Sequence, residues 1–147
     1  MILISFFKIF THVENQQKSS KALHVTLWVT QILLAAFLLM GTILKFQPIE
    51  EISKMMPWTG QVPAPMVRLL GVVDLIGALG LVLPALLRVK PQLTPWAAVG
   101  TIVLMICASI FHVSRGEASV IGVNIFAAIM AAFIAWGRFT RAPIPAK

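Results

Sequence analysis

Four stretches of the chain are apolar over about 20 residues, the length that a helix needs to cross the hydrocarbon core of a bilayer. They run over residues 22–46, 66–87, 94–113 and 119–137. In the first stretch, polar side chains recur at the spacing of one helix face. The expected fold is therefore all-α, an integral membrane four-helix bundle with short loops.

The segments outside the four stretches are short and are predicted to lie at the membrane surfaces. Residues 1–21 are expected to form an uncleaved N-terminal interfacial tail, because Lys8 interrupts their apolar run and no small-residue cleavage site follows. The loop after the first span places its apolar side chains on one side of a short interfacial helix. This loop is interpreted either as a lid over the mouth of the bundle or as a plain connector. Residues 138–147 are a basic tail, expected to be cytoplasmic.

Composition supports the membrane class and excludes several kinds of chemistry. Hydrophobic residues make up 59% of the chain and charged residues 12%, which is far from an ordinary soluble domain. Four spans leave no room for a soluble catalytic domain in 147 residues. The single cysteine, Cys107, has no CxxC neighbour, so dithiol exchange within this chain alone is excluded. Nucleic acid is not an expected partner, because no basic soluble surface is present beyond the short tails.

The charges are distributed unequally between the two sides that alternate across four spans. The N-terminal side has one acidic residue, Glu14, against eight basic ones: Lys8, Lys18, Lys21, Arg88, Lys90, Arg138, Arg141 and Lys147. On the other side four basic and four acidic residues balance, so the formal net charge of +7 belongs entirely to the N-terminal side. The positive-inside rule predicts that this side, with both termini, is cytoplasmic.

Asp74 is a carboxylate well inside the second apolar stretch, RLLGVVDLIGALGLVLP. An acidic side chain within a span costs about 2.5–3.5 kcal/mol on insertion scales, so it is expected to face the bundle interior and to mark a functional or pairing site. Because successive spans cross the membrane in opposite directions, further polar residues meet at the end of the bundle that faces away from the cytoplasm. The expected polar pocket there consists of Asp74, His112, Asn124, Lys45, Arg68, Arg115 and Glu117.

Two interpretations of this cluster remain open. It is either a structural network that orients four helices, since interhelical polar contacts contribute about 0.6 kcal/mol each, or an outward-facing pocket. In the pocket, Asp74 would titrate and His112 would relay protons or donate a hydrogen bond. No metal site is expected, because no second histidine or cysteine shares the depth of His112. Apolar walls with such donors would suit a quinone-like or lipid molecule.

The segment GVVDLIGALGLVLP, followed by LTPWAAVGTIVLMICASIFHVSRGE and then Asn124, resembles the DoxX-like family of small bacterial four-helix membrane proteins. The resemblance covers about residues 23–136, and it departs from the family in having Asp74 where glutamate is commoner. It implies the four-helix fold and the bacterial cytoplasmic (inner) membrane. Some relatives are associated with thiosulfate:quinone oxidoreductase and others with redox-linked membrane complexes. None supplies a catalytic motif that can be placed on this sequence.

Two functional hypotheses follow from different classes. In the first, the protein is a non-enzymatic component or assembly partner of a membrane complex, and its partners are membrane lipid and another membrane protein. In the second, it is a membrane subunit of a quinone-linked oxidoreductase, with Asp74, His112 and Arg115 at a quinone head group. No cofactor is evident in the sequence. Whether the chain is an enzyme and whether it forms a homo-oligomer stay open.

Overall fold

The computed structural model describes the backbone of residues 2–147, and the side chains of all of these except residues 2, 3, 6, 7 and 9–19. The long helices are α1 (Ile2–Lys45), α3 (Ala64–Leu87), α4 (Leu93–Ser114) and α5 (Ile121–Trp136). Shorter helical segments are α2 (Ile49–Met55), η1 (Pro57–Gly60), η2 (Ala118–Val120) and the π-helical turn η3 (Gly137–Arg141). No strand occurs in residues 2–147, and the predicted all-α four-helix fold is confirmed.

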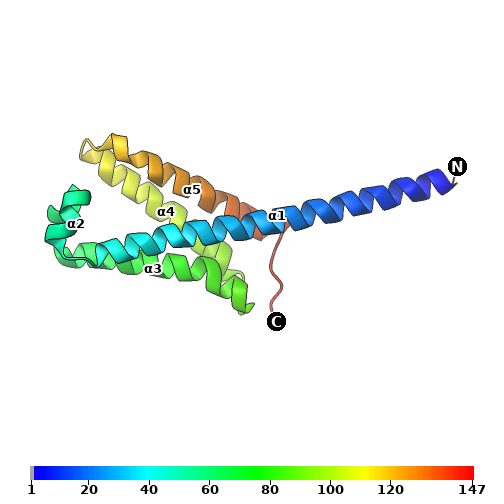
Figure 1. Ribbon diagram of the computed structural model, residues 1–147, viewed down its shortest axis with the longest axis horizontal. Helices are drawn as coiled ribbons and strands as arrows, with labels where there is room; N and C mark the ends of the chain where they lie inside the picture. The colour runs from blue at the N-terminus through cyan, green and yellow to red at the C-terminus, as the bar shows by residue number, and fades with distance from the viewer. Residues whose placement is uncertain (1) are drawn as a thin grey trace.

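The four long helices lie side by side as a bundle, with α1 against α3 and α4 against α5 (Figure 1). The segments long and apolar enough to cross a membrane are Ser20–Lys45, Ala64–Leu87, Leu93–Ser114 and Ala118–Arg141. α2 and η1 lie at the end of the bundle where α1 finishes and α3 begins (Figure 1). The connections are short, so each helix runs antiparallel to the next.

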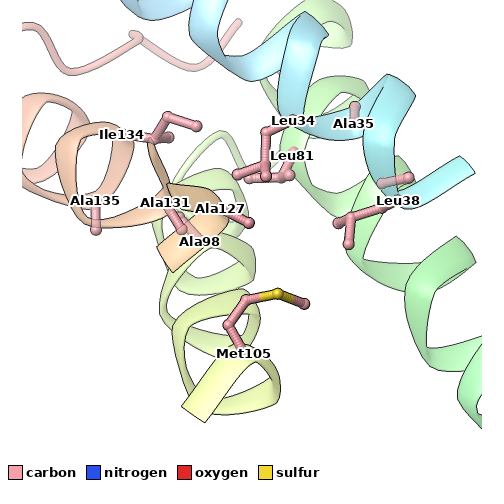
Figure 2. Packing of buried hydrophobic residues seen from close by; sticks show 11 residues of the cluster. Leu34, Ala35, Leu38, Leu81, Ala98, Met105, Ala127, Ala131, Ile134 and Ala135 are labelled. Carbon is pink, nitrogen blue, oxygen red and sulfur yellow. The ribbon is translucent and has the colours of Figure 1, made fainter. Parts of the chain in front are cut away.

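The core is narrow and is made of small and branched apolar side chains. Figure 2 shows Leu34 and Leu38 of α1 beside Leu81 of α3, with the alanines of α4 and α5 filling the space between helices. Large apolar side chains such as Ile76 and Ile129 instead point outward, 65% and 62% exposed. An apolar exterior around a small-residue interior is the pattern of helices that pack in lipid, where close backbone approach replaces the hydrophobic effect.

Local sequence explains where the helices begin and end. Pro65 stands in the first turn of α3, where a missing N–H costs nothing. The turn between α3 and α4 is sharp, because Arg88 and Lys90 take the left-handed conformation with φ of 56° and 46°. Gly116, with φ of 75°, makes the corresponding turn after α4, and there glycine is the residue that the backbone favours.

α1 is continuous from Ile2, so the proposed N-terminal tail extends the helix of the first span and projects beyond the bundle (Figure 1). Most of the apolar side chains that suggested an interfacial tail lie outside the described side chains. The tail's position relative to a membrane stays a prediction.

Candidate functional site

Asp74 lies on the face of α3 that packs against α1, and it is 5% exposed. Lys45 Nζ donates a hydrogen bond to Asp74 Oδ2 at 2.7 Å, closing an ion pair in which Asp74 is buried and Lys45 is partly buried. Gly41, one turn before Lys45, permits this approach, because a Cβ at that position would lie 2.8 Å from the same carboxylate oxygen. The opposite charges compensate each other, so both side chains are tolerated away from water.

Arg68 joins the same region through the backbone rather than through the carboxylate. Its Nη1 donates to the carbonyl oxygens of Lys45 and, at 2.8 Å, Gln47. These carbonyls follow the last turn of α1 and have no partner within the helix, so the guanidinium satisfies them. Arg68 also lies over the Phe46 ring, 5.7 Å from its centroid. Its role in the structure is to close the end of α1 next to the ion pair.

His112, Arg115 and Glu117 form a second group at the end of α4. His112 Nδ1 donates to Glu117 Oε2 at 2.8 Å, and Arg115 contacts Oε1 at 3.3 Å. These two hydrogen bonds, the one from His112 first, hold the pKa of Glu117 below its ordinary value. In the neutral imidazole, a proton on Nδ1 leaves the other ring nitrogen of His112 as an acceptor.

The first loop covers this second group. The Trp58 ring of η1 stands edge-on to Phe111 and His112, with centroids 5.9 and 6.3 Å apart. Arg115 donates to the side-chain oxygen of Gln61 in the same loop. The loop therefore packs on the end of α4, as either a lid or a connector would.

Asn124 lies apart from both groups. It is 8% exposed, and its Nδ2 has no hydrogen-bond partner among the described residues. Together with Ser109 it is a polar member of an apolar groove of about 470 Å³ between α4 and α5. Exposed isoleucines, among them Ile125 and Ile129, stand along the groove. An unpaired amide in an apolar groove is a donor without an acceptor, which is costly in lipid.

The seven residues expected at one pole thus occupy three places. Lys45, Asp74 and Arg68 are held between α1 and α3; His112, Arg115 and Glu117 at the end of α4; and Asn124 in the α4–α5 groove. Within the described part of the chain, no hydrogen bond or ion pair joins one of these places to another. A single pocket shared by all seven stays a prediction. Among the described side chains, no three His, Cys, Asp or Glu residues gather as metal ligands would.

A polar network that the sequence analysis did not foresee lies at the opposite end of the bundle. Arg138, counted there as a tail charge, is 3% exposed, and its Nε donates to Gln31 Oε1 at 2.6 Å. Gln31 is fully buried and donates from Nε2 to the carbonyl of Leu81 at 2.7 Å, which fixes the direction of its amide. Gly137 brings the chain onto α1, since a Cβ there would lie 2.5 Å from Leu27. The sequence did contain an indication of this network, because Gln31, deep in the first span, needs a hydrogen-bonding partner.

Comparison with known proteins bears on the family alone. No curated protein and no solved structure was found to match this chain. The model of the DoxX-like family matches residues 29–134, which takes in parts of all four long helices and most of the polar residues described above. With four helices long and apolar enough to cross a membrane, the chain is a multi-pass membrane protein that belongs to the DoxX-like family.

Proposed function

We propose that the protein is a non-enzymatic component of a membrane complex and that a transmembrane helix of a partner protein occupies the α4–α5 groove. The observation that carries the proposal is Asn124, which lines a groove edged by exposed isoleucines and whose Nδ2, buried beneath that surface, has no partner among the described residues. In lipid, an interhelical hydrogen bond from such an amide is a common means of association. The partner helix would present small residues to the isoleucines, and the Asn124 amide, covered in the isolated chain, would turn toward an acceptor on that helix.

The complex is proposed to lie in the bacterial cytoplasmic membrane with both termini inside. The distribution of charge supports this orientation. The turn between α3 and α4 carries Arg88 and Lys90, whereas the opposite end has Glu50, Glu51 and Glu117 beside its basic residues. Under the positive-inside rule, the α3–α4 turn is the cytoplasmic one.

Site-specific photo-crosslinking in intact membranes tests the proposal. A photoreactive residue at Ile129, in the groove, should give a discrete adduct with one other polypeptide. The matched control is Ile76 on α3, which is equally exposed but outside the groove. Asn124→Leu in the Ile129 probe should abolish the adduct. Equal adducts at both positions, an adduct with a second copy of the chain, or an adduct that survives Asn124→Leu would contradict the proposal.

A second candidate function is a membrane subunit of a quinone-linked oxidoreductase, and the geometry of His112 favours it. Glu117 fixes the Nδ1 proton, so the second ring nitrogen could accept a hydrogen bond from a quinol hydroxyl beside Trp58 and Arg115. This chain would hold the quinone head group, and the redox step itself would belong to a partner subunit that carries a redox centre. Quinone extracted from protein purified in mild detergent should fall in His112→Ala and persist in the control Ser114→Ala, at an exposed position two residues on. Equal quinone content in both variants would contradict this candidate.

A further inference from the structure

The buried guanidinium of Arg138 has only neutral partners among the described residues. Its Nε contacts Gln31, and its Nη1 contacts the carbonyl oxygen of Ala142 and Nδ1 of His24, both at 3.2 Å. The Trp28 ring lies 5.4 Å from its Cζ. Nη2 is buried, and no described side chain or backbone group forms a hydrogen bond with it. A cation in this setting lacks the compensating charge that buried ions require.

The acidic residues of the chain lie far from Arg138 along the helices. Glu50, Glu51, Asp74 and Glu117 belong to the other half of the bundle, where Asp74 and Glu117 have basic partners of their own. The fifth, Glu14, has a side chain outside the described ones, and its position on α1 is ten residues before His24, about 15 Å along the helix. The carboxylate of Lys147 lies at the same end, where the Lys147 N–H bonds to the Arg88 carbonyl, but among the described residues it forms no ion pair with Arg138. The counter-charge for Arg138 is therefore expected to come from outside the chain.

His24 carries a second mismatch at the same place. Trp28 Nε1 donates to its Nε2 at 3.1 Å, while Arg138 Nη1 faces its Nδ1 at 3.2 Å. A neutral imidazole has one N–H and one acceptor nitrogen, so it cannot accept from both donors. An anionic oxygen placed beside the ring would accept from Arg138 and from the ring N–H together, and so resolve both mismatches. Because His24 is exposed, such an oxygen can arrive from outside the bundle.

The surroundings are basic and lie at the level of a membrane interface. Lys21 is exposed one turn before His24 on α1, and Arg88 at the end of α3 is close enough for its charge to act on His24. The backbone N–H of Lys147 bonds to the carbonyl of Arg88, so the C-terminal residues fold back over this end. Basic pockets between transmembrane helices at the interface are typical binding sites for the phosphates of anionic lipids.

We propose that Arg138 and His24 bind the phosphate group of an anionic phospholipid. A phosphate oxygen replaces the Ala142 carbonyl as the acceptor for Arg138, and Gln31, fixed by Leu81, keeps the guanidinium in place. The lipid's acyl chains lie along the apolar exterior of α1 near Val25. The site is at the opposite end of the bundle from Asp74 and does not depend on the proposed function.

Lipid titration of the purified full chain, stripped of lipid in an uncharged detergent, tests the proposal. Phosphatidylglycerol should raise the Tm, whereas phosphatidylcholine and inorganic phosphate at the same concentration should not. Arg138→Gln should weaken the apparent affinity for phosphatidylglycerol by about tenfold or more, because a charge-assisted contact is lost. The matched control is Arg141→Gln, an exposed arginine three residues on, with a change of less than about threefold expected.

Other outcomes have definite meanings. Equal weakening in Arg138→Gln and Arg141→Gln would mean diffuse attraction to a basic surface and would overturn the proposal. An equal Tm rise with inorganic phosphate would assign the site to a soluble anion instead. No rise with any lipid would favour a carboxylate of a partner protein. If Arg138→Gln does not fold, His24→Ala, at an exposed position, should show the same selective loss, and its absence would contradict the proposal.

Discussion

The two ends of the bundle each bury a charged side chain, but they do so in different ways. Asp74 meets an opposite charge from the neighbouring helix at 2.7 Å, and the pair is complete within the chain. Arg138 is buried more deeply, at 3% exposure, and contacts an amide, a carbonyl and an imidazole. The comparison teaches that a buried charge has different meanings with and without a counter-charge beside it. A compensated pair needs no further charge, whereas an uncompensated cation agrees with the anionic ligand proposed above.

Breaking the compensated pair should have the largest effect on stability. Asp74→Ala leaves the partly buried Lys45 without a counter-charge, and we expect the free energy of unfolding in detergent to fall by about 2–3 kcal/mol. The double variant Lys45→Met with Asp74→Leu removes both charges and should lie within about 1 kcal/mol of the natural chain. Denaturant titration followed by circular dichroism measures both. If the double variant is as unstable as the single one, the pair does more than compensate charge.

The next test replaces the two glycines at which neighbouring helices approach closely, one at each end of the bundle. Gly41→Ala would place a Cβ 2.8 Å from Asp74 Oδ2, and Gly137→Ala would place one 2.5 Å from the buried Leu27. Each should lower the free energy of unfolding by about 1–3 kcal/mol, since neither neighbour can move freely. Gly100→Ala is the control, because nothing lies within 4 Å of its added Cβ. The control should be neutral or stabilising by up to about 1 kcal/mol through helix propensity.

Removing the uncompensated cation should have a smaller effect than removing Asp74. Arg138→Met leaves Gln31 Oε1 without a donor, which is destabilising, but it also removes a buried charge that has no counter-ion. In lipid-free detergent we expect a net loss of about 1 kcal/mol, measured by the same denaturant titration. A loss as large as that of Asp74→Ala would mean that Arg138 is fully compensated within the chain.

The smallest effect concerns Glu117, outside the spans. Its pKa in the folded protein lies below the ordinary 4.5, so the ionised form is favoured by folding. This contribution is complete above pH 4.5 and is lost as the pH falls through the lowered pKa. Glu117→Gln should therefore reduce the drop in Tm between neutral and acidic pH. Identical Tm profiles for both proteins would contradict a paired Glu117.

The helices and the Lys45–Asp74 pair were within reach of the sequence, because apolar length fixes the spans and alternation brings the end of the first to the start of the second. The sequence did not separate Asn124 from Asp74, since depth along a helix says nothing about which groove a side chain enters. Arg138 was missed because it follows the last apolar stretch and looks like a tail charge. The close approach of Gly137 to Leu27 and the hydrogen bond to the Gln31 amide place it inside the bundle.

In the turn between α3 and α4, a relaxed backbone and a positive charge require different residues. Arg88 and Lys90 adopt positive φ, a conformation that glycine accepts freely and that costs other residues about 1–2 kcal/mol. Glycine at both positions would relax this hairpin, yet it would delete two cations from the loop that the proposed orientation places in the cytoplasm. Under that proposal, the strained backbone of this turn is the cost of keeping two positive charges where they favour correct insertion.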